Sequence, residues 1–365
     1  MSLSVGLVGL PNSGKTTLFN ALSHSNALAA SFPFSTTVPN VAMVDLPDER
    51  LGAIASVIHP KSIVPAKISF VDVPGLVEKA SQGEGLGNQF LSELRQVDVM
   101  CIVLRLFDDA NIPHVYPTID PLRDYDILRT ELALSDLNIV ARRIEKTRRR
   151  VHVHDKSALK EMEVLKELDR WLNTGQYAKN APPSILEDLA KIEPLDLLTI
   201  KPMLIVANVG EEWAVNPNQA LDNALVSIAQ SLSTKYVTVC ARLENELTAF
   251  ESEEAQSFRE ALGMAHVSLS NVLIESYRVL DILTYYTFGE LGLKAWAVPN
   301  GTTAPQAAGK VHSDLESQFV KAEVFRWNDL IRAGSVDTLK MEGLIRLEGK
   351  EYRISEGDIL YFRAA

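Results

Sequence analysis

Apolar runs of strand length alternate with segments of helical period along much of the chain. Runs rich in β-branched residues lie at 3–10, 67–73, 99–106, 203–209 and 236–241, with a weaker run at 41–45. Segments 16–24 and 88–97 have the apolar spacing of helices and lie between the first strands. Strands that are apolar along their whole length suit a sheet that is covered on both faces. The pattern therefore predicts a doubly wound α/β domain.

The region from about 108 to 200 interrupts this alternation, because it is too long for a single crossover. Apolar residues recur there at steps of three and four in two sets: Ile127, Leu134, Leu137, Ala141 and Ile144, then Leu159, Met162, Leu165, Leu168 and Leu172. A basic stretch at 142–156 separates the two sets. We expect a helical hairpin over 121–199, its arms packed as an antiparallel coiled coil, inserted into an α/β domain formed by 1–120 and 200–280.

Residues 281–365 differ in character, with short alternating segments broken by glycine and proline. They predict a small β-rich domain. The turns Gly349-Lys350-Glu351 and Glu356-Gly357-Asp358 suggest hairpins. The aromatic side chains of this region could form a base-stacking platform, but such alternating residues more often belong to a core. They are Trp296, Phe325, Trp327, Tyr352, Tyr361 and Phe362.

Composition fits an ordinary globular protein, with 46% apolar and 23% charged residues among 365. The charge of 36 − 47 = −11 means that the molecule as a whole repels nucleic acid and acidic membranes, so contact with RNA requires a local basic patch. Cys101 and Cys240 lie in apolar runs and indicate buried thiols rather than a disulfide framework or a zinc site. No apolar run approaches the ~20 residues that cross a bilayer, and we expect a cytoplasmic protein without a membrane partner.

The strongest chemical signal is a phosphate-binding motif near the start of the chain. Residues 9–16, GLPNSGKT, fit G-x4-G-K-[ST], follow an apolar strand and open a helix. In such a turn, backbone N–H groups wrap phosphate oxygens, the lysine reaches the β- and γ-phosphates, and the threonine hydroxyl faces Mg²⁺. The predicted nucleotide contacts here are Asn12, Ser13, Gly14, Lys15, Thr16 and Thr17.

Two further segments could complete a site for Mg²⁺ and the γ-phosphate. Asp72 begins the sequence Asp-Val-Pro-Gly after the third strand, where its carboxylate can hold the metal shell and the amide of Gly75 can approach the phosphate. Thr36 lies between the first helix and the second strand, where a threonine could close over Mg²⁺ as a nucleotide-sensing loop. We therefore predict Thr16, Thr36 and Asp72 as metal ligands.

The base-binding end is predicted from two strand ends, Asn208-Val209-Gly210-Glu211 and Cys240-Ala241. The order of all these segments is that of a Ras-type G domain, but the fourth departs from N-K-x-D. Val209 replaces the lysine whose stem packs over guanine, and Glu211 is one methylene longer than aspartate. Adenine has no 2-amino group that could donate a hydrogen bond to such a carboxylate. Asn208 could still bind the N7/N6 edge of adenine. The pocket therefore favours ATP.

These segments together resemble the Obg-like ATPase, or YchF-type, family over nearly the whole chain. The resemblance rests on GLPNSGKTTLFNAL, PFSTTVPN, DVPGLVEKASQGEGLGNQFL, NVGE and the C-terminal TAPQAAGKVHSDLESQFVKAEV and EGKEYRISEGDILYFR. It implies an ATP-preferring OBG-type G domain with an inserted coiled coil, a C-terminal TGS domain of β-grasp fold, and association with the ribosome or RNA. Ser13, Pro74 and the segment 292–298 depart from the family's usual residues without removing a ligand.

The hydrolytic machinery is the least determined part. Leu76 stands where Ras-type enzymes have the glutamine that orients water, and it cannot form a hydrogen bond. Asn12 is one candidate, since resemblance to cation-activated members of the superfamily suggests that it could hold K⁺ against the phosphates. His114, where the family also places a histidine, is the other; its alternative is a solvated loop residue. Together with Lys15 these are the predicted catalytic residues.

The sequence leaves more than one possibility open for the binding partner and for nucleotide turnover. The basic cluster between the hairpin arms could contact RNA or the ribosome, either its large subunit or the whole particle, or could be a solvated helix face. It comprises Arg142, Arg143, Lys146, Arg148, Arg149 and Arg150. We expect a monomeric, slow ATPase that regulates translation or the stress response. The alternatives are a non-catalytic, nucleotide-gated binding protein and a conventional GTPase.

Overall fold

The structure is a computed structural model that describes residues 3–24, 40–73, 86–152, 155–250, 252–264, 267–289 and 292–365. The chain forms two compact units, of which the first contains residues 3–42 and 69–276 and the second contains 43–68 and 277–365. Within the described ranges, no helix has the length and apolarity needed to cross a membrane. The expected boundaries at 120, 200 and 280 stay a prediction.

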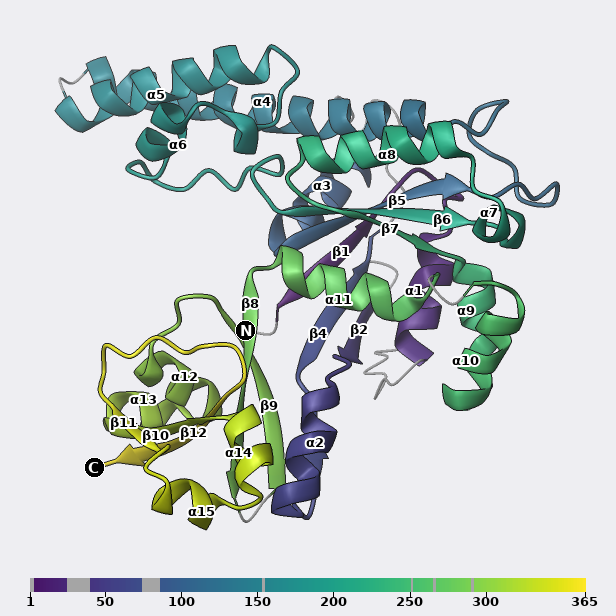
Figure 1. Cartoon of the computed structure of the whole chain (residues 1–365). Coiled ribbons are helices and arrows are strands. Elements are labelled where there is room, and N and C mark those ends of the chain that lie inside the picture. The colour runs from purple at the N-terminus through teal and green to yellow at the C-terminus, as the bar shows by residue number, and fades with distance from the viewer. Residues whose placement is uncertain are drawn as a thin grey trace. The chain divides into compact units, whose positions relative to one another are not determined.

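The first unit is built on a six-stranded sheet with the order β2-β4-β1-β5-β6-β7 (Figure 1). Its strands are β1 (Ser4–Val8), β2 (Asn40–Asp45), β4 (Lys67–Asp72), β5 (Val99–Leu106), β6 (Met203–Val209) and β7 (Tyr236–Val239). Strand β1 pairs in parallel with β4 and β5, and the order continues in parallel through β6 to β7. Strand β6 is buried along its whole length, as its apolar sequence predicts. The doubly wound α/β prediction is confirmed.

Helices cover both faces of this sheet. Figure 1 shows α3 and α8 on one side and α1 and α11 on the other. The helices outside the hairpin are α1 (Lys15–His24), α3 (Leu86–Gln96), α7 (Glu211–Val215), α8 (Gln219–Ser231), α9 (Ala241–Leu247), α10 (Ser252–Ala261) and α11 (Leu269–Val279). The apolar core between the sheet and α3 includes Phe90, Leu94 and Ile102. Cys101 and Cys240 are both buried, as predicted.

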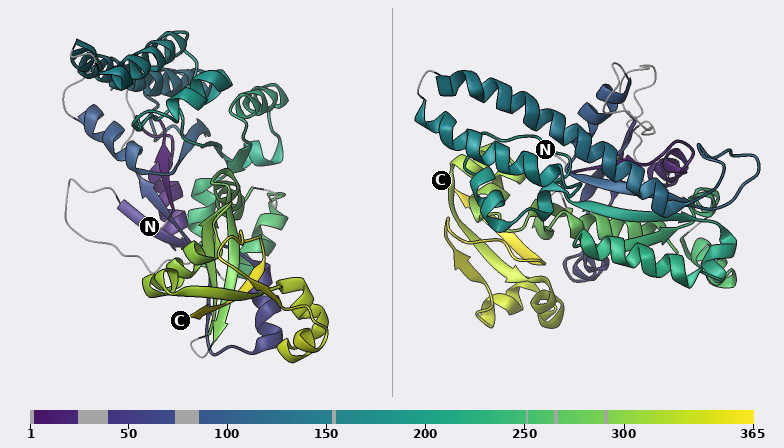
Figure 2. Two further views of the ribbon diagram at one scale, coloured as in Figure 1. Left: turned by 90° about the vertical axis from the view of Figure 1, so that its left-hand side faces the viewer. Right: turned by 90° about the horizontal axis from the view of Figure 1, so that it is seen from above.

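The predicted hairpin is present as two long antiparallel helices, α4 (Pro121–His152) and α5 (Lys156–Leu172), which lie side by side in Figures 1 and 2. A short 3₁₀ helix, η1 (Ala178–Asn180), and α6 (Pro183–Leu189) complete the insert. Its apolar core includes Val140, Leu165 and Leu168. The predicted apolar stripe of α5 is wrong at one position, because Leu159 is 49% exposed and Val164 packs inward instead.

The returning segment after α6 is fastened to α4 by the buried carboxylate of Asp136. That carboxylate accepts hydrogen bonds from the backbone N–H of Leu198 and Thr199, at 2.9 and 2.7 Å, and from the Thr199 hydroxyl at 2.8 Å. Arg95 of α3 supplies the opposite charge, with Nη1 3.2 Å from Asp136 Oδ1. We refer to these four residues as the Asp136 clasp.

The second unit carries a six-stranded sheet with the order β11-β10-β12-β8-β9-β3. Its elements are α2 (Glu49–Ile58), β3 (Ile63–Val64), β8 (Ile282–Gly289), β9 (Gly292–Pro299), α12 (Ala304–Val311), α13 (Ser313–Ser317), β10 (Phe319–Arg326), α14 (Trp327–Ala333), α15 (Val336–Met341), β11 (Arg346–Glu348) and β12 (Asp358–Ala364). Apolar clusters lie on both faces, one containing Leu283, Ala307 and Val324 and the other Tyr286, Phe325 and Leu330.

Residues 43–68 join this second unit although they precede it by more than 200 positions. Strand β3 pairs in parallel with β9, where Ile63 lies opposite Leu293. Helix α2 is held by Asp48, whose Oδ2 accepts a hydrogen bond from the Tyr286 hydroxyl at 2.5 Å, and by an ion pair between Arg50 and Glu356. Nothing in the apolar pattern of the sequence indicated this association.

Two expectations for the C-terminal region can be judged from these pairings. The hairpins predicted at Gly349-Lys350-Glu351 and Glu356-Gly357-Asp358 are wrong within the described range 292–365, because β11 and β12 each pair with β10, which lies between them. The core interpretation of the aromatic residues holds for Phe325, which is buried, and for Trp296, Trp327, Tyr352 and Phe362, which pack against the two clusters. Tyr361 is 41% exposed.

Candidate functional site

The phosphate-binding turn connects β1 to α1, as its motif requires. Asn12 and Gly14 both adopt left-handed backbone conformations, with φ of 62° and 91°. A Cβ atom on Gly14 would lie 2.0 Å from Asn208 Nδ2, so a side chain there is excluded by both conformation and space. The glycine thus allows the turn to approach the end of β6.

Lys15 is the first residue of α1 and is only 6% exposed. Its Nζ donates hydrogen bonds to the carbonyl oxygens of Gly9 and Leu10, at 3.0 and 2.9 Å. Burial lowers the pKa of Lys15 from 10.5 to about 8, although the charge of Asp72 acts in the opposite direction. The two carbonyl oxygens are uncharged acceptors. A phosphate group bound in the turn would give the Lys15 ammonium a negatively charged partner.

Thr16 and Asp72 are brought together beside Lys15. The Thr16 hydroxyl donates to Asp72 Oδ2 at 3.0 Å. Burial raises the pKa of Asp72 above its ordinary value, while the Thr16 hydrogen bond and the charge of Lys15 lower it. A hydroxyl and a carboxylate at this distance offer the oxygen ligands that Mg²⁺ prefers, so the residues present fit that ion. Thr36 and Gly75 lie outside the described residues.

A cavity of about 1260 Å³ opens over the turn and the ends of β5, β6 and β7. Most of the predicted nucleotide contacts line it, namely Asn12, Gly14, Lys15, Thr16, Thr17, Asn208, Val209, Glu211, Cys240 and Ala241. Ser13 does not line it; this residue is buried, and its hydroxyl has no hydrogen-bond partner among the described residues. The volume is ample for a nucleoside triphosphate.

Asn208 ties the base end of the cavity to the phosphate end. Its Nδ2 donates to the carbonyl of Ser13 at 2.9 Å, and its Oδ1 accepts from the backbone N–H of Ala241 at 3.1 Å. The side chain is buried, so these bonds fix the spacing between the turn, β6 and the start of α9. One N–H of the amide remains for a base, and its predicted contact with the N7/N6 edge stays a prediction.

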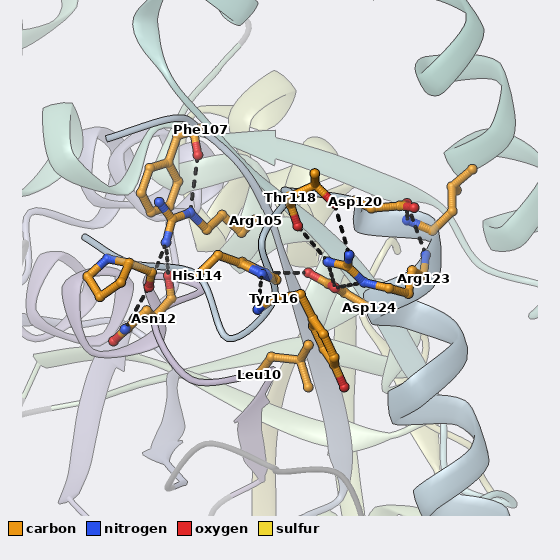
Figure 3. Close-up of polar contacts among 12 residues, drawn as sticks. Leu10, Asn12, Arg105, Phe107, His114, Tyr116, Thr118, Asp120, Arg123 and Asp124 are labelled. Atoms are coloured by element: carbon orange, nitrogen blue, oxygen red, sulfur yellow. Dashed lines mark hydrogen bonds and ion pairs between the residues drawn. The ribbon is translucent and has the colours of Figure 1, made fainter. Parts of the chain in front are cut away.

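His114 lies in the loop between β5 and α4, and its side chain is 5% exposed (Figure 3). Its Nδ1 accepts from the backbone N–H of Tyr116 at 3.1 Å, which places the ring proton on Nε2, 2.9 Å from Asp124 Oδ2. Arg123 holds the other oxygen of Asp124, with Nη2 at 2.8 Å, and stacks on the Tyr116 ring. His114 is therefore oriented on both sides, and it is not a solvated loop residue. It is not among the residues that line the cavity.

Two residues near His114 were not singled out from the sequence. Phe107 lines the cavity and lies beside Gly14 and Gly210. Arg105, the penultimate residue of β5, is 1% exposed and donates to main-chain carbonyls of both the turn and the His114 loop. The signal that could have found Arg105 is a charge inside the otherwise apolar run VMCIVLRL.

Comparison with known families matches two stretches of the chain. Residues 4–132 match the family MMR_HSR1, described as 50S ribosome-binding GTPase, and residues 282–365 match YchF-GTPase_C, described as a protein of unknown function. "Ribosome-binding ATPase YchF" of Bacillus subtilis is 40% identical over 365 residues, covering 100% of this chain and 99% of the relative. The protein of that name from Mycoplasma genitalium is 42% identical over 366 residues, with 99% of each chain covered.

The fold comparison agrees with the sequence comparison. The structure of the Schizosaccharomyces pombe YchF GTPase superposes with a TM-score of 0.84 at 31% identity, covering 99% of this chain and 98% of that one. A GTP-binding protein from Pyrococcus horikoshii shares the fold, with a TM-score of 0.59 at 18% identity over 100% of both chains. From the full-length identity to its relatives, we conclude that the chain belongs to the YchF family.

Proposed function

We propose that this protein binds and hydrolyses ATP with Mg²⁺ and uses the cycle to change its affinity for the ribosome. The observation that carries the proposal is the cavity itself, which Lys15 and Thr16 line at one end and Val209 and Glu211 at the other. Asp72 adjoins the phosphate end through its hydrogen bond from the Thr16 hydroxyl. The names of the relatives, which describe ribosome-binding ATPases, support both the activity and the partner.

The phosphate end derives its chemistry from charge and backbone geometry. Lys15 would exchange its two carbonyl partners for phosphate oxygens, and its buried position makes that interaction stronger than the same contact in water. Thr16 and Asp72 would hold Mg²⁺, which neutralises charge that develops on the phosphates during transfer. Helix α1 begins at Lys15, so its N-terminal N–H groups point toward the same phosphates.

The base end favours adenine over guanine for reasons of hydrogen bonding. A guanine site needs a carboxylate close to the ring's N1–H and 2-amino group, and a long aliphatic stem over its face. Val209 supplies no such stem, and Glu211 is the first residue of the short helix α7. The solved relative is titled a GTPase whereas the curated relatives are named ATPases. Relative affinity for the two nucleotides is therefore the measurement that decides the point.

His114 is our candidate for orienting the attacking water. With its Nε2 proton held by Asp124, the ring is set up to accept a proton through Nδ1, in the manner of a histidine oriented by a carboxylate. That role requires Nδ1 to leave the Tyr116 N–H and the 107–120 loop to bring the ring to the cavity. Catalytic hydrogen bonds often form only in the reactive complex, so the buried position is compatible with it.

Asn12 is our candidate for a K⁺ ligand. Its Nδ2 donates to the Pro113 carbonyl at 2.9 Å, so the side chain links the turn to the His114 loop in this structure. Its Oδ1 is the atom that would face a cation beside the phosphates. Under this proposal, replacing K⁺ by Na⁺ slows hydrolysis without weakening ATP binding.

The outer face of α4 is our candidate for the ribosome contact. Two arginines of this cluster already have carboxylate partners within the protein and are not available for RNA phosphates. Arg143 pairs with Glu161 and Glu193, and Arg150 pairs with Asp155 and Glu161. Arg148 pairs with Glu145 of the same helix. Arg142, Lys146 and Arg149 are exposed and spaced so that they share one face of α4. They form a short basic stripe on an acidic protein, which suits RNA phosphates.

Steady-state phosphate release from ATP, measured with and without ribosomes, tests the proposal. We expect slow release that ribosomes accelerate. The second candidate function, a nucleotide-gated binding protein that does not hydrolyse, is favoured by one observation: both ring nitrogens of His114 are engaged within its own loop and α4. Absence of release under both conditions, with ATP still bound, would establish that second function instead.

A further inference from the structure

Arg105 occupies an unusual environment for a buried arginine. Its guanidinium lies over the Phe107 ring, 4.4 Å from the centroid. Nε donates to the Phe107 carbonyl at 3.2 Å, and Nη2 donates to the Ile112 carbonyl at 2.8 Å. Nη1 lies 3.3 Å from the carbonyl oxygen of Asn12 and 3.5 Å from that of Pro113. Figure 3 shows Arg105 between Phe107 and Asn12.

Every one of these hydrogen-bond partners is a main-chain carbonyl. In the described part of the chain, no carboxylate lies within 4.0 Å of the guanidinium, although buried arginines are ordinarily paired with one. A flat fork with five donors can reach several carbonyls at once, whereas a lysine ammonium is a single point. The shape of arginine, rather than its charge alone, is what this position uses.

The carbonyls belong to two separate segments. Asn12 lies in the phosphate-binding turn, while Ile112 and Pro113 directly precede His114. The Asn12 side chain closes the same link from the other direction, donating to the Pro113 carbonyl at 2.9 Å. The planar guanidinium of Arg105 contacts the carbonyls of both Asn12 and Pro113. A shift of the turn's main chain at Asn12 is therefore transmitted through this rigid group to Pro113, the residue that precedes His114.

We propose that Arg105 is a positioning residue that couples the phosphate-binding turn to the His114 loop, so that ATP in the turn sets the position of His114. The inference rests on the proposed role of His114 in hydrolysis and goes beyond it, since Arg105 touches neither the water nor the phosphates. It acts on turnover by holding the peptide that carries the histidine.

Arg105→Lys is the main test, because it keeps the charge and loses the fork. We expect kcat for ATP hydrolysis to fall about 10- to 100-fold, as a displacement of about 1 Å can do, with KM and the affinity for a non-hydrolysable ATP analogue changed less than threefold. Arg95→Lys is the matched control, since Arg95 is another arginine of the same unit with little exposure and belongs to the Asp136 clasp. It should lower stability and leave kcat unchanged.

A double-mutant cycle separates this inference from the function on which it rests. If Arg105 acts through His114, then Arg105→Lys should change kcat less than twofold in a chain that already carries His114→Ala. If His114→Ala alone leaves kcat unchanged, the proposed role of His114 fails. If His114→Ala lowers kcat but the two substitutions multiply their effects, Arg105 does not act through His114 and the inference is overturned.

Amide hydrogen exchange supplies a readout that does not depend on turnover, and its first part uses only the unmodified chain. In the unmodified chain, adding the ATP analogue should change the exchange of amides 110–118, and of Tyr116 in particular, whose N–H is bonded to His114. In Arg105→Lys that response should be lost while the thermal shift caused by the analogue persists. An unmodified chain whose loop exchange does not respond to the analogue would overturn the coupling, even if the variants failed to fold.

Discussion

Asp136 and Arg105 are both buried charged side chains of the first unit, but they are held by partners of different kinds. Asp136 faces an opposite charge and three further donors, all fixed at the base of the hairpin. Arg105 donates hydrogen bonds only to main-chain carbonyls, and three of these four carbonyls belong to the loop between β5 and α4. The fully paired Asp136 carboxylate stabilises one arrangement of α3, α4 and the 197–200 segment. Arg105, whose hydrogen-bond acceptors are uncharged carbonyls, can hold the turn and the His114 loop together while still allowing them to move.

The Asp136 clasp and the surroundings of Arg105 lie at different places in the first unit, and we expect them to affect different properties, stability and turnover. The clasp lies between α3, α4 and the 197–200 segment, and none of its residues lines the cavity. The Arg105 carbonyls lie beside the turn and His114. Changes at the first location should be seen in unfolding and changes at the second in catalysis.

The largest effect is expected from Asp136→Ala. This change leaves Arg95 and the N–H groups of Leu198 and Thr199 without their carboxylate, so the free energy of unfolding should fall by about 3–5 kcal/mol. Urea unfolding measures it. Asp126→Ala, in an exposed pair on the same helix, is the control and should cost at most about 0.5 kcal/mol. A loss below 1 kcal/mol at Asp136, or weaker ATP binding, would remove the distinction between the two locations.

The next effect concerns catalysis at the loop that Arg105 holds. His114→Ala should lower the single-turnover rate of ATP hydrolysis about 100-fold, because an oriented acid–base group is lost, while ATP affinity stays within threefold. His312→Ala serves as the control, since His312 is exposed in the second unit. An unaltered single-turnover rate in the His114 variant would exclude this histidine from the chemistry.

A smaller effect should appear in the pH dependence of stability. Lys15 resembles Arg105 in donating only to carbonyls, but a lysine can lose its proton. Because its pKa falls from 10.5 to about 8 on folding, the unfolded chain binds more protons between those values, and stability gains a contribution as pH rises through that window. Relative to Lys15→Met, the unmodified chain should gain about 1–3 kcal/mol from pH 8 to 10. Parallel curves for the two proteins would contradict the lowered pKa.

The smallest effect on stability is expected where charges face water. Reversal of Arg142, Lys146 and Arg149 to glutamate should change the free energy of unfolding by about 0.5 kcal/mol or less. It should nevertheless weaken ribosome co-sedimentation and reduce its salt dependence, because phosphate contacts are lost. Reversal of Lys156, Lys160 and Lys166, on the other arm of the hairpin, is the control. Equal binding by both triple variants would place the contact elsewhere.

The sequence predicted most of what is local or periodic. Strands β5 and β6, the turn at residues 9–16 and the two hairpin arms follow from apolar period and a motif with a definite mechanism. The register of α5 failed at Leu159 because a single sequence does not say which of two adjacent apolar stripes faces the partner helix. Pairing of β3 with β9 is a contact between distant segments that has no local signal.

The candidate site shows the same division. Most of the described residues that were predicted from motifs line the cavity. The surroundings of His114 instead depend on a loop whose conformation no periodic pattern describes. Asn208 was predicted as a base contact, and the structure adds a second use for it, the bridge from Ser13 to Ala241. Arg105 could be noticed as a charge in an apolar strand, but its carbonyl partners come from folding the loop back over it.

Isothermal titration of the full chain with non-hydrolysable ATP and GTP analogues, with and without Mg²⁺, tests the central claim most directly. Occupation of the cavity by an adenine nucleotide predicts one site per chain, with the ATP analogue bound at least tenfold more tightly than the GTP analogue and both weakened when Mg²⁺ is removed. Equal or tighter binding of the GTP analogue, or no binding of either, would contradict the account.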